Sequence, residues 1–226
     1  MRDTIPTTDL RPFLASCDVI DSNADAVRDL ARRLASNTEG FGTVVKLFEW
    51  VRDEVAHTGD AGEGKITSRA SDVLRERTGL CYAKSHLLVA LLRAVSIPAG
   101  LCYQRLRYDE ATPSFVLHGL VGVRMPDDTF LRIDPRGNKP GIDVQLAPWR
   151  EALAFRPEHP GEVDLPGVFA RPNPAVVSAL AIGGIWHPVD THLPDVSPED
   201  WPAGDADWTS PQSARESELV TVEYPR

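Results

Sequence analysis

Apolar and polar positions follow two different periods along the chain, and the change of period separates predicted helices from predicted strands. Through most of the first 95 residues, apolar side chains recur every three or four positions, the spacing of an amphipathic helix. The predicted helices cover residues 24–36, 41–57, 70–75 and 81–95, with a loop over residues 59–64. The last helix is apolar nearly all round from Leu87 onward, so we expect it to be central and buried.

Short apolar runs bounded by turn residues follow these helices and predict strands. The predicted strands cover residues 99–106, 115–124 and 130–134. Pro126, Asp127 and Asp128 are typical turn residues, so we expect the last two strands to form a hairpin. After Asp134, prolines and glycines are frequent, and only one short helix is expected, near residues 149–154. Helices followed by an antiparallel sheet are typical of an α+β domain.

Composition and charge narrow the class of protein. The 226 residues include 33 acidic and 24 basic ones, which gives a formal net charge of −9. The sequence has no cluster of basic residues of the kind that binds the phosphates of nucleic acid. No stretch approaches the roughly 18 consecutive apolar residues of a membrane span, and the N-terminus lacks a signal-peptide pattern. We therefore expect a cytoplasmic protein that binds neither nucleic acid nor membrane. Its odd number of cysteines, three, predicts free thiols.

The last 44 residues differ from the rest of the chain. Residues 183–226 hold nine acidic and two basic residues, a net charge of −7, together with six prolines. We predict one domain over residues 1–182 and an acidic, proline-rich extension over residues 183–226. Three of the five tryptophans fall in this extension, which suggests that their rings anchor it against the domain or a partner. Residues 218–224 alternate like a strand.

Cys81 is the cysteine best placed for chemistry, because it opens the long predicted helix. The positive end of a helix stabilises a thiolate, and its free backbone N–H groups can receive an oxyanion. Cys17 and Cys102 have no helix start beside them, so we interpret them as small buried apolar residues.

A cysteine nucleophile needs a base, and the base needs a group that orients it. His118 lies in one predicted hairpin strand and Asp134 ends the other, 16 residues later. The turn lies about midway between them, so the two side chains are expected to be neighbours across the hairpin. Each of these residues also has an ordinary structural explanation, and only their combination favours a Cys–His–Asp site.

Other motifs do not predict a cofactor or a metal. Residues 59–65 have the glycine and lysine spacing of a phosphate loop, but Ile66 stands where Ser or Thr is needed, and the segment follows a helix. His187 and His192 do not match the usual zinc spacings. No calcium-loop pattern is present. We therefore expect no cofactor and no metal site.

The segment VLRERTGLCYAKSHLLVALLRAVSIPAGLCYQ, residues 73–104, resembles the nucleophile region of the transglutaminase-like superfamily of cysteine enzymes. Upstream, KLFEWVRDEVAH is similar to a family helix, and His118 and Asp134 fall where the family has its histidine strand and its Asp-Pro strand. The resemblance implies a papain-like transglutaminase-core fold. It also implies Cys81 as nucleophile, His118 as base and then acid, and Asp134 as orienting carboxylate.

Three short stretches of the chain depart from common family patterns. Many members have His-Ala-Trp in the histidine strand and Asp-Pro-Thr in the other, where this chain has His118-Gly119-Leu120 and Asp134-Pro135-Arg136. Tyr82 follows the cysteine, where several branches have Trp or another residue. These changes concern the surroundings of the substrate rather than the three site residues.

The first hypothesis is therefore a thiol enzyme that attacks a peptide or protein amide by acyl transfer, with water as the acceptor in a peptidase or amidase. The same residues would serve an amine-acceptor transferase, so the acceptor stays open. A thioester-dependent acyltransferase is less favoured, because Thr78-Gly79-Leu80 lacks the Gly-Gly step typical of that branch. A non-catalytic domain that binds a peptide or a partner is the hypothesis from another class.

Overall fold

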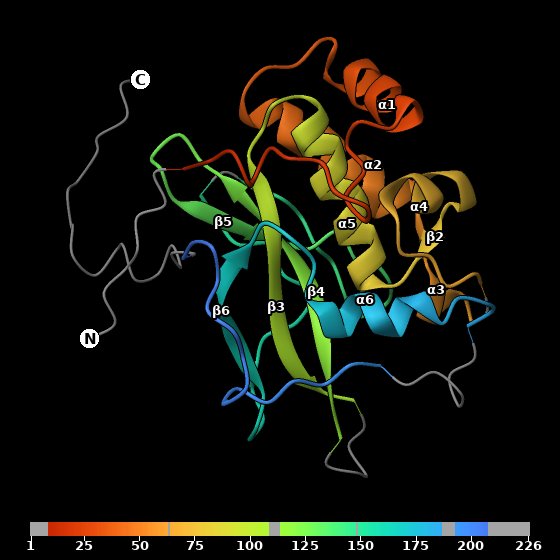
Figure 1. The fold of residues 1–226 in the computed structure, drawn as a ribbon, viewed down its shortest axis with the longest axis vertical. Coiled ribbons are helices and arrows are strands. Elements are labelled where there is room, and N and C mark those ends of the chain that lie inside the picture. The colour runs from red at the N-terminus through yellow and green to blue at the C-terminus, as the bar shows by residue number, and fades with distance from the viewer. Residues whose placement is uncertain (1–8, 63, 109–113, 148, 187–192, 208–226) are drawn as a thin grey trace.

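The computed structural model describes residues 9–62, 64–108, 114–147, 149–186 and 193–207 (Figure 1). Its six helices are α1 (Asp25–Ala35), α2 (Phe41–Glu54), α3 (Thr58–Ala61), α4 (Ala70–Glu76), α5 (Cys81–Ala94) and α6 (Pro174–Ala181). Its six strands are β1 (Ala56–His57), β2 (Thr78–Gly79), β3 (Ala99–Arg107), β4 (Phe115–Arg124), β5 (Phe130–Ile133) and β6 (Val163–Phe169). Helices come first and the main sheet second, so the predicted α+β class is confirmed.

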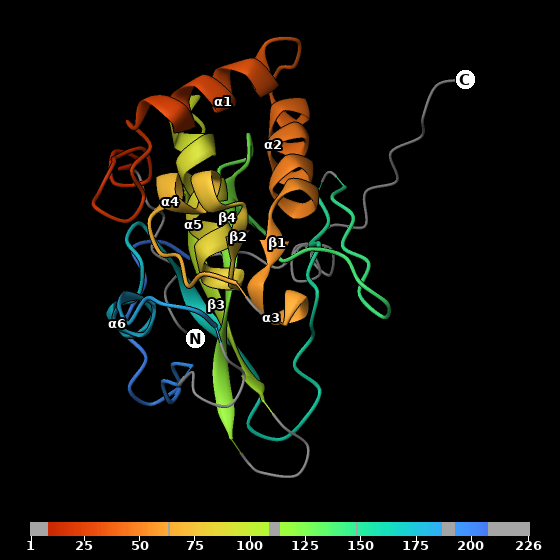
Figure 2. The same ribbon diagram turned by 90° about the vertical axis from the view of Figure 1, so that its right-hand side faces the viewer.

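Helix α5 is the centre of the fold, as its apolar composition predicts. Every residue from Cys81 to Arg93 is buried. The helix contacts α1, α2 and α4 on one side and strands β3 and β4 on the other. Figure 1 shows α5 between the main sheet on one side and α1, α2 and α4 on the other, and Figure 2 shows α1 crossing the end of α5 with α2 beside it. A helix that is apolar all round is stable in water only when it is enclosed in this way.

The main sheet has four antiparallel strands in the order β5-β4-β3-β6. Strands β3 and β4 pair over their whole length, from Ala99 opposite Val123 to Arg107 opposite Phe115. The predicted hairpin of β4 and β5 is present, and it pairs from Arg124 opposite Phe130 to Val121 opposite Ile133. A smaller apolar cluster, which includes Phe13, Cys102, Leu120, Phe130 and Val168, is separate from the main core around α5.

The chain after Asp134 differs most from the predictions. Residues 149–154 form no helix, because Ala152 pairs with Ile133 at the edge of β5 and its carbonyl accepts the Asp134 N–H at 3.0 Å. Strand β6 was not predicted, because Pro166 and Gly167 interrupt its pattern. Helix α6 was also missed, and α3 forms one turn within the predicted loop. A tertiary contact thus overrides the local helix preference at 149–154.

The described part of the C-terminal extension lies against the domain. The Trp201 ring packs edge-on against Tyr103 and Phe169, and its indole N–H donates to Pro166 O at 2.9 Å. Ala206 pairs with Val168 of β6. Two of the predicted anchors, Trp186 and Trp201, therefore pack on the domain. Trp208 and residues 218–224 lie outside the described residues, and the division at residue 182 stays a prediction.

Arg93 ties together the end of α5 and three other segments. Its buried guanidinium donates to Ala99 O at 3.0 and 2.8 Å, to Ala15 O at 2.6 Å and to Ala170 O at 2.8 Å. Burial lowers the pKa of Arg93 to about 10, which still leaves it charged at neutral pH. A charged donor shared by three carbonyls is a strong link between segments that are distant in sequence.

We expect Arg93→Met to lower the free energy of unfolding by about 3 kcal/mol or more, because buried carbonyls lose charged donors while the apolar stem is kept. Arg32→Met on the exposed face of α1 is the matched control, expected to change that free energy by less than about 0.5 kcal/mol. Urea unfolding of both variants measures the difference. Equal effects would contradict the role given to Arg93.

Candidate functional site

Cys81 is the first residue of α5, where the sequence predicts it. The N-cap residue, Leu80, supplies no side-chain hydrogen bond to the helix start. Cys81 lines a cleft and keeps 8% of its surface exposed. Its sulfur therefore lies at the positive end of a 14-residue helix whose first N–H groups have no side-chain cap.

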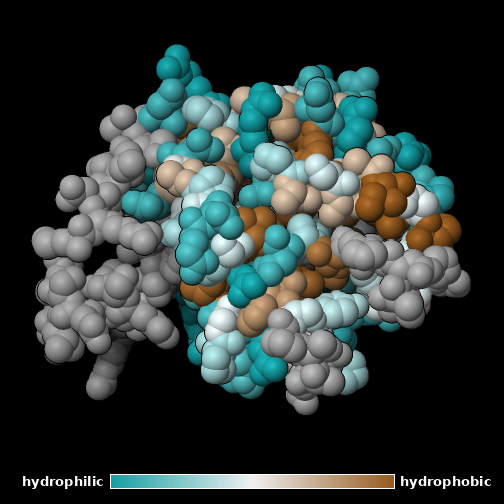
Figure 3. Space-filling model, turned by 60° about the horizontal axis from the view of Figure 1, so that its bottom comes forward, coloured by the Kyte–Doolittle hydropathy of each residue, from teal (hydrophilic) through white to brown (hydrophobic). Residues whose placement is uncertain are grey.

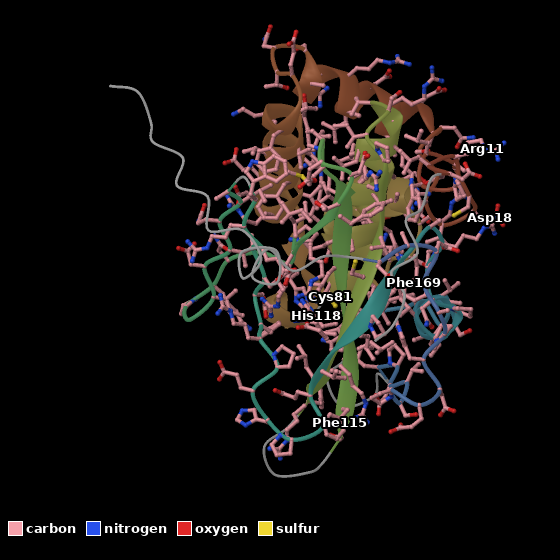
Figure 4. The ribbon with its side chains drawn as sticks, turned by 90° about the vertical axis from the view of Figure 1, so that its left-hand side faces the viewer. Arg11, Asp18, Cys81, Phe115, His118 and Phe169 are labelled. Carbon is pink, nitrogen blue, oxygen red and sulfur yellow. The ribbon has the colours of Figure 1, made fainter. Side chains whose placement is uncertain are left out.

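His118 and Asp134 lie within hydrogen-bonding distance of each other, and both are buried. His118 Nε2 and Asp134 Oδ2 are 2.7 Å apart. Paired residues end at Val121 and Ile133, so Asp134 directly follows the ladder and reaches His118 diagonally rather than from the opposite position. Figure 4 shows Cys81 and His118 side by side, at the point where α5 begins beside β4.

The Asp134 carboxylate is held by three N–H donors. Besides His118, the backbone N–H groups of Arg136 and Ala154 donate to it at 2.9 and 3.1 Å. Burial alone would raise the pKa of this carboxyl, but the charge and hydrogen bond of His118 and the two backbone donors lower it below its ordinary value. Asp134 is therefore ionised although it is completely buried.

His118 is held in one orientation by this carboxylate. Burial alone would lower the pKa of His118, but the charges and hydrogen bonds of Asp134 and Cys81 outweigh burial and raise it to about 10. When the imidazole is neutral, Nε2–H donates to Asp134, and Nδ1 is left as the nitrogen that can accept a proton from Cys81. The Phe155 ring packs edge-on against the imidazole at 5.0 Å.

Two departures from the family pattern, Tyr82 and Gly119, are in contact with each other. A Cβ on Gly119 would lie 3.0 Å from Tyr82 Cδ1 and 3.1 Å from Tyr82 Cα. The Tyr82 hydroxyl donates to Leu117 O, and Ser85 Oγ donates to Gly119 O at 3.1 Å. Glycine beside His118 therefore permits the close approach that brings the start of α5 to the histidine strand.

Lys84, one turn after Cys81, ties α5 to the end of α2. Its buried ammonium donates to Val55 O and, at 3.2 Å, to Arg52 O. Burial lowers the pKa of Lys84 to about 7, while the charge of Asp134 opposes this shift. Nothing in the sequence pattern indicates this contact, because the residues are brought together only by the packing of α2 on α5.

The cleft beside Cys81 has a volume of about 780 Å³. Apolar and basic side chains make up most of its lining. The apolar lining residues include Leu80, Leu106, Val116, Leu117, Leu153, Ala154, Phe155, Trp186 and Leu193. The charged ones are Asp60, Arg107, Arg136, Lys139, Arg156, Glu158 and Glu162. Figure 3 shows one face of the molecule with apolar patches set among hydrophilic side chains.

Sequence reasoning missed one wall of this cleft, which is built around Asp60. The Asp60 carboxylate pairs with Arg136 at 2.7 Å and with Lys139 at 2.8 Å. His57 lies beside it, with Nδ1 3.7 Å from Asp60 Oδ2. Burial lowers the pKa of His57 to about 3, and its Nδ1 has no hydrogen-bond partner among the described residues. No local pattern marks this wall, since its members come from separate segments.

The remaining candidates lie elsewhere, as predicted. All three cysteines are free thiols, and burial raises the pKa of Cys102 to about 12. Cys17 is partly buried, so its predicted full burial is corrected. His86 is a buried packing residue whose Nδ1 faces Ser68 O at 2.9 Å. Within the described parts of the chain, no group of His, Cys, Asp and Glu is arranged to hold a metal ion.

Comparisons with known proteins point to one family. The family model described as "Transglutaminase-like superfamily" matches residues 28–135. This range contains α5, both hairpin strands and all three predicted site residues. No curated protein matches the sequence.

Several solved structures resemble part of the chain. A candidate cysteine protease from Cytophaga hutchinsonii is 25% identical to this chain. The match covers 59% of this chain and 45% of the other, with a TM-score of 0.46. A candidate protease from Parabacteroides distasonis is 14% identical over 50% of this chain and 26% of its own, with a TM-score of 0.36. The periplasmic domain of TgpA from Pseudomonas aeruginosa is 20% identical over 57% of this chain and 48% of its own chain, with a TM-score of 0.41. This chain spans less than half of each.

No helix in the described ranges combines the length and the apolar character needed to cross a membrane. The cytoplasmic location stays a prediction.

We expect the buried His118–Asp134 pair to make stability depend on pH. The pKa of His118 is raised above its unfolded value of 6.5, so its contribution is fully present below pH 6.5 and is lost as pH rises through about 10. Asp134→Asn removes the partner charge. The difference in free energy of unfolding between wild type and this variant should shrink by about 2 kcal/mol between pH 6 and pH 10.5.

Urea unfolding across that pH range measures this difference. Asp128→Asn, at an exposed position in the β4–β5 turn, is the matched control and should show no such change. A wild-type advantage over Asp134→Asn that stays constant with pH would contradict the charged pair.

Proposed function

Residues 28–135 match the family model of the transglutaminase-like superfamily, and on that premise we propose that the chain is a thiol hydrolase that cleaves a peptide or protein amide through Cys81, His118 and Asp134. The expected papain-like fold, with N-terminal helices packed on an antiparallel sheet, is confirmed. The observation that carries the proposal is the 2.7 Å contact of His118 and Asp134 beside a cysteine that opens a helix.

The first half of the reaction forms an acyl-enzyme. The Cys81 proton passes to His118 Nδ1, and the sulfur attacks the amide carbonyl carbon, so a C–S bond forms and the carbonyl oxygen gains the electron pair. N–H groups at the start of α5 stabilise this oxyanion. The C–N bond then breaks, His118 gives its proton to the departing amine nitrogen, and a thioester on Cys81 remains.

The second half releases the acid. Water attacks the thioester carbonyl and gives a proton to His118, and the C–S bond breaks to return the electron pair to sulfur. The imidazolium and thiolate that remain are the same pair that the first proton transfer forms, so the site is ready to attack the next amide. Asp134 keeps Nε2 protonated throughout, so Nδ1 is the atom that moves the proton.

Charge in the cleft favours water over an amine as acceptor. An alkyl ammonium would meet Arg107, Arg136, Lys139 and Arg156 along the lining. Two of the three lining carboxylates are already engaged: Asp60 binds Arg136 and Lys139, and Glu162 accepts three backbone N–H groups. With four basic and three acidic side chains, the lining has a net charge of +1, which disfavours a cationic acceptor modestly and does not affect water.

We expect the 226-residue protein to release fragments with a new C-terminal carboxylate from a mixed peptide library, observed by mass spectrometry. Cys81→Ala should lower the rate at least about 1,000-fold, because it removes the nucleophile. Cys102→Ala is the matched control, since Cys102 is buried in the separate apolar cluster, and should retain activity.

Repeating the assay with an added primary amine distinguishes the acceptors. Fragments that keep a free carboxylate support hydrolysis, whereas incorporation of the amine would replace it with the transferase hypothesis. Cleavage that persists in Cys81→Ala would contradict both.

A further inference from the structure

We propose that Trp186 and Leu193, which follow α6 in the chain, form the substrate-selecting wall of the cleft and favour a large apolar side chain next to the attacked amide. The inference rests on the proposed function and deepens it. Both residues lie outside the matched family region, which ends at residue 135, so this part of the cleft belongs to the chain's own C-terminal segment.

Residues 184–186 are fixed on the α3 side of the cleft by backbone pairing. Residues 184–186 run antiparallel to residues 64–66, with Ile66 N donating to Gly184 O at 2.9 Å. Trp186 N donates to Gly64 O at 2.7 Å. These bonds set the backbone of Trp186 beside the loop that leads from α3 to α4, so its ring is a fixed part of the wall.

Residues 193–195 are fixed on the side of the histidine strand. Leu117 N donates to Pro194 O at 2.8 Å, and the Arg105 guanidinium binds both carboxylate oxygens of Asp195 at 2.7 Å. Leu117 directly precedes His118. Leu193 is therefore held next to the strand that carries the base, and it lines the cleft that contains Cys81.

Trp186 is positioned by apolar contact rather than by its indole N–H. Its side chain is 4% exposed and belongs to the main core, yet Nε1 has no hydrogen-bond partner among the described residues. A buried tryptophan usually finds a partner for this group, as Trp201 does at Pro166 O. The ring is therefore held by its apolar contacts in the main core, and it also lines the cleft.

Leu80 on the α5 side and Leu106 on β3 line the same cleft, so together with Trp186 and Leu193 they give a peptide an apolar wall to pack against. A peptide lying along Cys81 places the side chain next to its attacked amide against such a wall. Removing that side chain from water is favourable in proportion to its apolar area, so leucine- or phenylalanine-sized groups gain more than alanine. The chemistry of the wall thus selects a large apolar residue.

The test compares two peptide amides that differ only in the residue on the acyl side of the cleaved bond, leucine or alanine. Wild type should show a higher kcat/KM for the leucine peptide. Leu193→Ala and Trp186→Phe should each reduce this leucine-to-alanine ratio about tenfold, because a hydrophobic pocket discriminates by a few methylenes. Thermal melting establishes that each variant is folded.

Val196→Ala is the matched control, because Val196 lies in the same segment and packs on the core but does not line the cleft. It should leave the ratio unchanged. Cleavage of both peptides by wild type at equal rates, or a ratio that survives both cleft variants, would overturn the inference while leaving the proposed function intact. Failure of wild type to cleave either peptide, or any member of the library, would overturn the proposed function itself.

Discussion

The site depends on keeping one carboxylate charged where no solvent reaches it. A buried charge is costly unless hydrogen bonds and a partner charge compensate it. Asp134 has two backbone N–H donors and the His118 ring, and these contacts require residues 152–154 to lie extended beside the end of β5. The irregular chain after Asp134 thus helps to orient the imidazole of His118.

A second constraint is the distance between helix α5 and strand β4. The cysteine and the histidine come from different elements, and they meet because Gly119 has no side chain at the point where Tyr82 packs. The Tyr82 hydroxyl and Ser85 Oγ then fix that contact through carbonyls of β4. Lys84 adds a link from the same helical turn to the end of α2, so Tyr82, Lys84 and Ser85 each have a positional role.

The sequence predicted the parts of the molecule whose burial follows a local period. Helix α5 and the β4–β5 hairpin were found in this way, and with them Cys81, His118 and Asp134. Strand β6 was hidden because Pro166 and Gly167 break its pattern, and its partner β3 lies far away in the chain. Helix α6 was missed although Asn173 and Pro174 form a usable start signal. Trp186 and Leu193 carry no local signal, since only tertiary contacts bring them to the cleft.

The pairing of His118 with Cys81 can be tested by the pH dependence of alkylation at Cys81 in wild type and in His118→Ala. Mass spectrometry after iodoacetamide treatment follows Cys81 against Cys17 and Cys102 in the same sample. We expect Cys81 to react first at pH 6, where an ordinary thiol with a pKa of about 8.5 is protonated, and His118→Ala to remove this advantage. Identical pH profiles for Cys81 in the two proteins would contradict it.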